Sequence, residues 1–233
     1  MTEPQLEPKV LPSADRPARE RWLMALLALA LAAGAGYHAR NLYLAWQELE
    51  LEEPEPMLLA DVLGSATACV YILLLAALFL IRLPLVAKFD ELRPKLFAIV
   101  GSFLPFAVTF FPPAEEVPLA VHEAASAATL VAMALAVAIV YWLGRSFSIT
   151  PQARRLVTTG PYGLVRHPLY LVEYIASLGV FVHFLSPWTA LITLVQGYVQ
   201  LRRMAWEERI LARAFPDYAS YAARTARILP GIY

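Results

Sequence analysis

Six apolar runs dominate this chain, and each is long enough, or nearly so, to cross a lipid bilayer. The first begins at Trp22 and reads WLMALLALALAAGAGYHARNLYLAW; a helix rises 1.5 Å per residue, so about 20 residues cross a hydrocarbon core of about 30 Å. The others lie at about 58–81, 96–111, 119–143, 169–185 and 188–206. Backbone groups in lipid must be satisfied within helices or closed barrels, and these runs lack the alternation of barrel strands. The sequence therefore predicts an all-α, polytopic transmembrane bundle of about six spans.

The composition agrees with a lipid-embedded protein. The chain is 59% hydrophobic and only 16% charged, and its formal net charge is zero. Soluble domains are about 25% charged, and nucleic-acid binding needs clustered, uncompensated Lys and Arg, so both classes are excluded. The single cysteine, Cys69, lies inside an apolar run and supplies neither a disulfide nor a Cys-based metal site. His38, His122 and His183 are scattered along the chain, so we expect no metal.

The charges between the apolar runs predict the orientation. Lys and Arg accumulate on the cytosolic side, and here they occur in the tail and in every second connection, whereas QELELEEPEP and PPAEEVP are acidic and lack both. We expect a multi-pass protein with both termini in the cytosol, in the inner or plasma membrane of a bacterium or the endoplasmic reticulum of a eukaryote. The predicted division is a flexible cytosolic tail (1–21), four N-terminal transmembrane helices (22–144) and a region that carries the chemistry (145–233).

The connection before the fifth run is the most informative stretch, RRLVTTGPYGLVRHPLYLVEY. Pro168 suits the first turn of a helix, which predicts His167 at the N-cap and Tyr170 within the first turn. Gly160 and Gly163 flank a Pro-Tyr pair, allowing a tight turn and a close approach of backbone to a ligand. A pocket here would offer helix N-terminal amides, an imidazole and phenols to a zwitterionic ligand.

The last run carries a polar stripe. Gln196, Gln200, Arg203 and Glu207 recur at steps of four, three and four, so they share one helical face. Ionisable groups near membrane depth are functional candidates, although an intrahelical Arg-Glu pair with snorkelling arginines is the structural alternative. A tight connection between the fifth and sixth runs predicts an antiparallel helical hairpin, which returns this stripe to the face that bears His167.

These motifs together resemble a known family. TTGPYGLVRHPLYL, followed after the hairpin by an EE pair and FPDYASYAARTARILP, is similar to the C-terminal catalytic region of the isoprenylcysteine carboxyl methyltransferases and phospholipid methyltransferases. The resemblance covers about residues 154–230 and does not extend to the first four runs. It implies an integral membrane methyltransferase that uses S-adenosylmethionine, with a cofactor pocket closed by the hairpin and a C-terminal cytosolic helix.

The resemblance also implies roles for individual residues. His167 and Tyr170 would lie against the cofactor, the Gly160 turn would shape the same pocket, and the EE pair would contact the cofactor's amino-acid end or the reacting group. Neighbouring helical residues point about 100° apart, so we expect one glutamate to face inward, and the stripe favours Glu207. The predicted cofactor-binding set is Gly160, Pro161, Tyr162, Arg166, His167, Tyr170, Glu207 and Glu208.

The sequence does not identify the methyl acceptor. Arg203 could hold a carboxylate acceptor bidentately, and Glu207 could hold an ammonium and help remove its proton; these two are the predicted catalytic residues. Glu173, Tyr174 and Gln200 are the predicted substrate-binding residues. The predicted partners are a lipidic or hydrophobic acceptor, either a carboxylate or an amine, and membrane lipids.

Two other functions compete. An NADPH-dependent membrane reductase of the sterol reductase kind also carries an HPxY-like element, often followed by an acid such as Glu173, but the EE pair with its flanking arginines favours methyl transfer. A non-catalytic membrane protein of the same fold is the other alternative.

Overall fold

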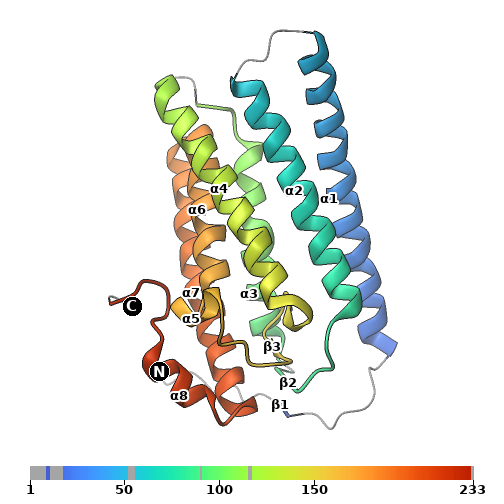
Figure 1. Cartoon of the computed structure of the whole chain (residues 1–233), viewed down its shortest axis with the longest axis vertical. Coiled ribbons are helices and arrows are strands. Elements are labelled where there is room, and N and C mark those ends of the chain that lie inside the picture. Colours follow the sequence, from blue (N-terminus) through green and yellow to red (C-terminus); the bar gives the residue numbers. More distant parts are fainter. Residues whose placement is uncertain (1–8, 11–17, 52–55, 90, 115–116, 232–233) are drawn as a thin grey trace.

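Long helices run side by side along the molecule (Figure 1). The computed structural model describes residues 9–10, 18–51, 56–89, 91–114 and 117–231. Its long helices are α1 (Ala18–Leu51), α2 (Pro56–Ile81), α4 (Leu119–Leu143), α6 (Pro168–His183) and α7 (Pro187–Ala214). The short strands, α5 (Pro161–Leu164) and α8 (Tyr218–Arg224) gather at the lower end in Figure 1. The predominantly helical fold predicted from the apolar runs is confirmed.

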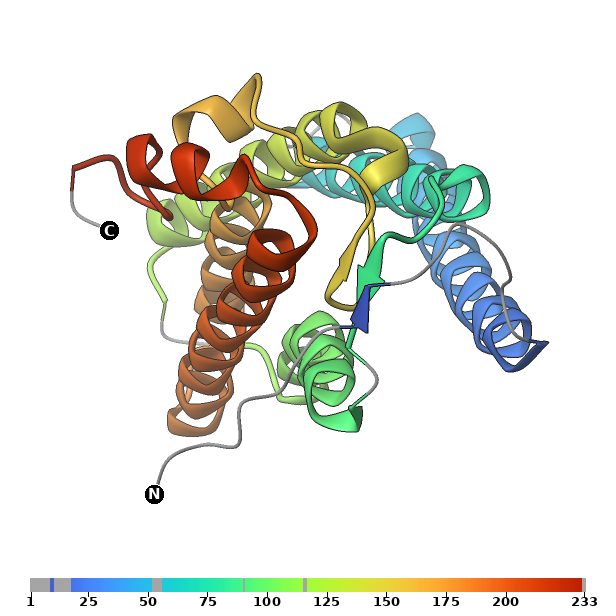
Figure 2. The same cartoon turned by 90° about the horizontal axis from the view of Figure 1, so that it is seen from below.

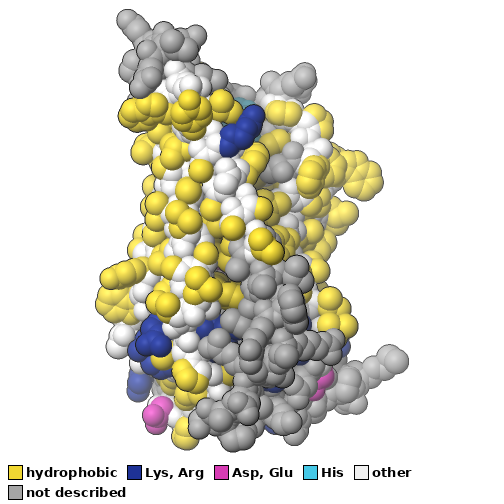
Figure 3. Space-filling model, turned by 90° about the vertical axis from the view of Figure 1, so that its right-hand side faces the viewer, with side chains coloured by type: hydrophobic (Ala, Val, Ile, Leu, Met, Phe, Trp, Pro, Cys, Tyr) yellow, Lys and Arg dark blue, Asp and Glu magenta, His cyan; other side chains and the backbone are white. Residues whose placement is uncertain are grey.

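Two segments are long and apolar enough to cross a membrane within the described part of the chain, Val62–Ile81 and Leu119–Ser146. Only 17% of the first and 28% of the second are buried. Their apolar side chains therefore face mostly outward, as they would toward lipid rather than in the core of a soluble protein. Figure 3 shows hydrophobic side chains over the middle of one face of the molecule, with most of the visible Lys and Arg near its lower end.

The run at 96–111 is not one continuous α-helix. Helix α3 covers Leu92–Phe103, and a 3-10 helix follows from Leu104 to Phe110. Pro105 lacks a backbone N–H and disfavours helical geometry at the residue before it, so the α-helix stops there. Twelve residues rise only about 18 Å, which is less than the hydrocarbon core. Helix α3 alone therefore does not cross the core, and the third of the six predicted spans stays a prediction.

A small sheet, which the all-α prediction missed, joins three distant segments. Strands β1 (Lys9–Val10), β2 (Ala87–Lys88) and β3 (Gln152–Ala153) pair in that order and antiparallel. Two residues of the tail predicted to be flexible thus pair with a connection between helices; residues 1–8 and 11–17 lie outside the described residues. The sheet lies among the helix ends in the view from below (Figure 2).

The sheet is anchored on α7. Ala87, Phe89 and Ala153 form a buried cluster with Trp206 and Ile210 of α7. Small alanine side chains allow the strands to approach the helix closely, so the large aromatic groups fill the remaining space. This packing attaches both connections to the helix that carries the polar stripe.

Close helix packing sets the position of α6. A Cβ on Gly179 of α6 would lie 2.0 Å from Oγ1 of Thr129 and 2.8 Å from the backbone oxygen of Ala125, both on α4. Small residues at such contacts let membrane helices approach each other. The chain then turns through Phe184, Leu185 and Ser186 into α7, where Ser186 and Thr189 form a reciprocal capping box. The predicted helical hairpin is present.

Candidate active site

The turn before α6 requires a glycine. Gly160 has φ +60°, and a Cβ at this position would lie 2.2 Å from Cε2 of Trp142. An L-side chain would therefore be strained and would also clash with the indole. The turn leads into α5, and the carbonyl of Tyr162 accepts a hydrogen bond of 2.7 Å from the hydroxyl of Tyr221. Burial raises the pKa of the Tyr162 phenol well above its ordinary value, and the charge of Glu207 adds to that effect, so the phenol stays protonated.

His167 caps α6, as predicted, with Pro168 in the first helical position. The segment after α8 holds the preceding backbone in place. The amide of Arg166 donates to the carbonyl of Ala226 (2.8 Å), and the amide of His167 donates to the carbonyl of Arg227 (3.1 Å). The RHP element (Arg166, His167 and Pro168) is therefore held in place by a part of the chain about 60 residues further on. Sequence spacing gives no signal for this contact, which we call the C-terminal clamp.

Glu208 lies at the centre of a charged cluster beside this clamp. One of its oxygens lies 3.1 Å from Nε2 of His167 and 3.1 Å from Nη1 of Arg166, and the other lies 2.9 Å from Nη2 of Arg227. Burial alone would raise the pKa of Glu208, but His167, Arg227 and Arg166 outweigh it and lower the pKa below its ordinary value. The carboxylate is thus charged at neutral pH and ties α7 to the RHP element.

Glu207 takes a different direction from its neighbour. Its carboxylate accepts a hydrogen bond of 2.5 Å from the hydroxyl of Tyr170 and lies 3.9 Å from Nδ1 of His167. Glu207 lines the main cavity, whereas Glu208 does not. The two adjacent acids are therefore separated by the helix rotation of about 100° per residue, one facing the cavity and one facing the charged cluster.

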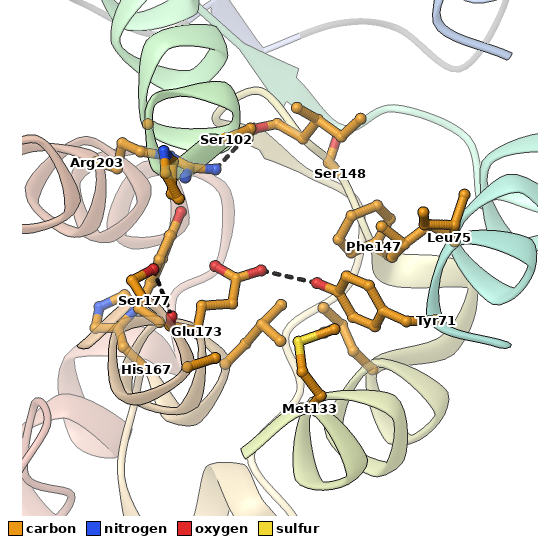
Figure 4. A pocket seen from close by; sticks show the side chains of 18 of the residues that line it. Tyr71, Leu75, Ser102, Met133, Phe147, Ser148, His167, Glu173, Ser177 and Arg203 are labelled. Carbon is orange, nitrogen blue, oxygen red and sulfur yellow. Dashed lines mark hydrogen bonds between the residues drawn. The ribbon is translucent and has the colours of Figure 1, made fainter. Parts of the chain in front are cut away.

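A buried polar chain continues from α7 toward α2. Arg203 donates from Nη1 to Oε1 of Gln200 (3.0 Å), and Gln200 donates to Glu173 (3.4 Å). Glu173 in turn accepts a hydrogen bond of 2.8 Å from the hydroxyl of Tyr71. Figure 4 shows Glu173 and Tyr71 pointing toward each other across the pocket. The guanidinium of Arg203 also lies 4.9 Å from the ring centre of Tyr170, in cation–π geometry.

Three of the four residues of the polar stripe on α7 are buried, and the fourth, Glu207, is 26% exposed on the cavity wall. Gln196, Gln200 and Arg203 are only 2%, 3% and 6% exposed. Arg203 directs its guanidinium toward Gln200 and the carbonyl of Ile149, which differs from the intrahelical pair with Glu207 considered above. A Cβ on Gly101 of α3 would lie 2.8 Å from Cδ of Arg203, so the absence of a side chain there makes room for the arginine.

These residues border a cavity of about 1070 Å³. Helix α6 lines its length, since residues 167, 170, 173, 176, 177, 180 and 183 all contribute to the wall at helical steps. Sixteen residues make α6 about 24 Å long. Leucine, isoleucine, phenylalanine and methionine side chains from α1, α2, the 3-10 helix and α4 complete the walls. One end of the cavity is thus charged and hydrogen-bonding, and its interior is largely apolar.

The structure distributes the predicted site residues among four places. The cavity wall includes Tyr162, Arg166, His167, Tyr170, Glu173, Arg203 and Glu207. Gly160 and Pro161 form the turn behind it, and Glu208 belongs to the charged cluster. Gln200 and Tyr174 line a smaller pocket between α6 and α7, where the hydroxyl of Tyr174 lies 2.9 Å from the Cβ position of Gly197.

Sequence reasoning missed several contributors. Tyr71 lies inside an apolar run and is only one of several polar residues along that helix, so it gave no distinct signal. Tyr221 and Arg227 lie in the C-terminal segment that carries the resemblance, but neither was assigned a role. His122 and His183 are not scattered in space: their Nδ1 atoms lie 2.9 Å apart. Residues 61 positions apart have no local pattern that predicts such a pair.

A family model matches the part of the chain that builds most of this site. The model described as phospholipid methyltransferase matches residues 121–218. The match covers α4, α6 and α7 and ends before the C-terminal clamp.

Two curated relatives match over a shorter stretch. The cobalt-zinc-cadmium resistance protein CzcN of Cupriavidus metallidurans is 42% identical over 77 residues, which is 32% of this chain and 35% of the relative. The nickel-cobalt-cadmium resistance protein NccN of Alcaligenes xylosoxydans xylosoxydans is 33% identical over 81 residues, which is 34% of this chain and 38% of the relative. The chain thus matches little more than a third of the length of these relatives.

A solved structure shares the fold along nearly the whole chain. The eukaryotic intramembrane Ras methyltransferase ICMT (isoprenylcysteine carboxyl methyltransferase) superposes with a TM-score of 0.51 at 16% sequence identity, covering 94% of this chain and 88% of that one. The fold is therefore that of a polytopic membrane protein.

Proposed function

The chain belongs to the isoprenylcysteine carboxyl methyltransferase and phospholipid methyltransferase family of integral membrane methyltransferases, and from that premise we propose that it transfers a methyl group from S-adenosylmethionine to a lipidic or hydrophobic acceptor. The observation that carries the proposal is the 2.5 Å contact between Tyr170 and Glu207. It joins the RHPxY element to the EE pair on the wall of a cavity that continues into an apolar interior. The reaction then takes place at the cytosolic interface of a six-span protein with both termini in the cytosol.

The charge distribution supports this orientation. The end that contains the site carries Arg145, Arg154, Arg155 and Arg166 in one connection, and Lys and Arg mark the cytosolic side of membrane proteins. A water-soluble cofactor would reach this end directly. A lipid acceptor would reach the same cavity from the bilayer, which explains why such a site is built at an interface.

The residues present fit the cofactor. S-adenosylmethionine supplies an electrophilic methyl group on a positively charged sulfur, and its amino-acid end carries both an ammonium and a carboxylate. The carboxylate of Glu207 and the guanidinium of Arg166 both line the cavity and match these two charges. Within the described residues, Nε of Arg166 and Oε1 of Gln196 are buried without a hydrogen-bond partner. Buried polar atoms of this kind need a partner, and a zwitterionic ligand offers one.

For methyl transfer from a sulfonium, the protein mainly has to align the reactants and exclude water. Tyr170, His167 and the clamp hold Glu207 in one position on the wall. Arg203 lies next to Tyr170 and could hold a carboxylate acceptor. Glu173 lies deeper, with Tyr71 and Gln200 donating to it, and could hold an ammonium acceptor and receive its proton.

Binding of the demethylated cofactor to detergent-purified protein tests the proposal. Calorimetry should show saturable binding by the wild type and at least about tenfold weaker binding by Glu207→Gln, because a charged hydrogen-bonding group contributes about 1.5–3 kcal/mol. His167→Gln should weaken binding as well. Glu123→Gln, an exposed acid on α4, is the matched control and should bind as the wild type does.

Transfer of a labelled methyl group into membrane lipid extracts would then identify the acceptor by its chemistry. Absence of cofactor binding by well-folded wild type would overturn the proposal, and binding of NADPH instead would favour the reductase.

A further inference from the structure

Two histidines meet at the end of the cavity opposite the predicted methyl-transfer site. His122 lies in the first turn of α4 and His183 is the last residue of α6. Their Nδ1 atoms lie 2.9 Å apart, and the rings are tilted by 42°. Nε2 of His183 lies 3.2 Å from the hydroxyl oxygen of Ser126. The length of α6, about 24 Å, separates this pair from His167.

The separation of the two nitrogens fits two ligands of one metal ion. Imidazole nitrogens bind Zn²⁺ at about 2.0–2.1 Å, so two of them at angles of 90–110° lie about 3 Å apart. Metal-binding histidines usually use their other ring nitrogen to donate to an oxygen, which orients the ring and selects the tautomer. Ser126 is placed to accept such a bond from Nε2 of His183, and Nδ1 of His183 then presents its lone pair toward His122.

The backbone holds both histidines in place without using their rings. The amide of His122 donates to the carbonyl of Pro118 (3.1 Å), and the carbonyl of His183 accepts from the amide of Ala114 (2.9 Å). The close contact of Gly179 with α4 fixes the two helices one turn away from the pair. A rigid pair of ligands requires little rearrangement when an ion binds.

The pair also has access to a ligand. His183 and Ser126 line the same cavity as the methyl-transfer site. Within the described residues, no group of three or more His, Cys, Asp or Glu gathers around a common point. Two imidazoles fill only part of the coordination shell of such an ion, so water or a donor group of a molecule inside the cavity could occupy another position.

We propose that His122 and His183 form a binding site for one divalent transition-metal ion, of the kind that prefers imidazole, at the end of the cavity remote from Glu207. Zn²⁺, Co²⁺ and Ni²⁺ match two imidazole ligands, whereas Mg²⁺ and Ca²⁺ prefer oxygen. The site is independent of the proposed methyl transfer, because its ligands lie at the opposite end of α6.

The test is metal binding to detergent-purified protein that carries no polyhistidine tag. Calorimetry with Zn²⁺ and absorption spectroscopy with Co²⁺ should show one saturable equivalent per chain, and Mg²⁺ should not compete. His122→Ala and His183→Ala should each abolish the saturable phase. Ser126→Ala should weaken binding by about 10-fold to 100-fold, as loss of a group that orients a metal ligand does. His38→Ala, another cavity histidine, is the matched control and should bind as the wild type does.

Other outcomes would overturn the proposal. Wild type that binds no Zn²⁺, or both histidine variants binding with wild-type affinity, would show that the pair is only a hydrogen bond between rings. Thermal unfolding in detergent, followed by circular dichroism, checks that each variant is folded without relying on cofactor binding, so failure of the metal site stays distinct from failure of the methyltransferase proposal.

Discussion

Removal of the negative charge of Glu208 should loosen the end of the bundle that contains the candidate site. Its carboxylate contacts Arg166, His167 and Arg227 at 2.9–3.1 Å, and its side chain is 18% exposed. Glu208→Gln keeps one acceptor oxygen but removes the negative charge that both guanidinium groups contact. Hydrogen bonds to charged groups contribute about 1.5–3 kcal/mol, and partial exposure keeps the loss below that of a fully buried pair. We expect destabilisation by about 2–3 kcal/mol, or about 5–10 °C in Tm for a chain of this size.

The pH dependence provides a second, independent readout. The pKa of Glu208 lies below its ordinary value in the folded protein, so its contribution to stability is complete above the ordinary carboxyl pKa of about 4.3. The contribution is lost as the pH falls through the lower folded pKa. The difference in Tm between wild type and Glu208→Gln should therefore be constant from about pH 5 to 7 and should shrink below about pH 4.

Thermal unfolding in detergent, followed by circular dichroism at several pH values, measures both effects. Glu123→Gln is the matched control, since this acid is exposed on α4, and it should change Tm by less than about 1 °C. Equal Tm values for wild type and Glu208→Gln at pH 7, or a difference that does not narrow in acid, would refute the assignment of Glu208 to the charged cluster.

Three further substitutions test other parts of the structure. Gly179→Ala places a Cβ 2.0 Å from Oγ1 of Thr129 and should lower stability by about 1–3 kcal/mol, with partial recovery in combination with Thr129→Ala; thermal unfolding measures both. Gly160→Ala meets Trp142 and an unfavourable φ, so it should lower Tm and weaken cofactor binding in calorimetry. Arg203→Lys loses the planar fork that contacts a glutamine amide and a backbone carbonyl, so labelled methyl transfer should fall at least about tenfold while cofactor affinity changes little.

Local patterns predicted the elements of this protein well. Pro168 placed His167 at a helix N-cap, and the steps of four and three along the last run predicted the buried stripe of Gln196, Gln200 and Arg203. Each of these predictions depends on residues within one or two helical turns of each other. The 3-10 helix after Phe103 had a signal, Pro105, but the apolar composition of the run outweighed it.

Local sequence patterns could not predict the contacts between distant segments. The sheet pairs residues 9–10 with 87–88 and 152–153, and each strand is too short to show alternation. Arg227 approaches Glu208 only because the chain turns back after α8. His122 and His183 meet because α4 and α6 pack side by side, with the start of α4 next to the end of α6. Long-range packing, rather than local secondary-structure propensity, determines all three contacts.

The boundary of the family match has a consequence for specificity. Residues 121–218 include the RHPxY element and the EE pair, so most of the charged end of the cavity is built from matched sequence, while Arg227 lies beyond the match. The opposing walls come largely from α1, α2 and α3 with its 3-10 helix, and Tyr71, which reaches Glu173, lies among them. Substitutions in those walls would not remove the contacts that position His167 and Glu207. Under the proposed function, we therefore expect acceptor specificity to depend on residues of α1 to α3.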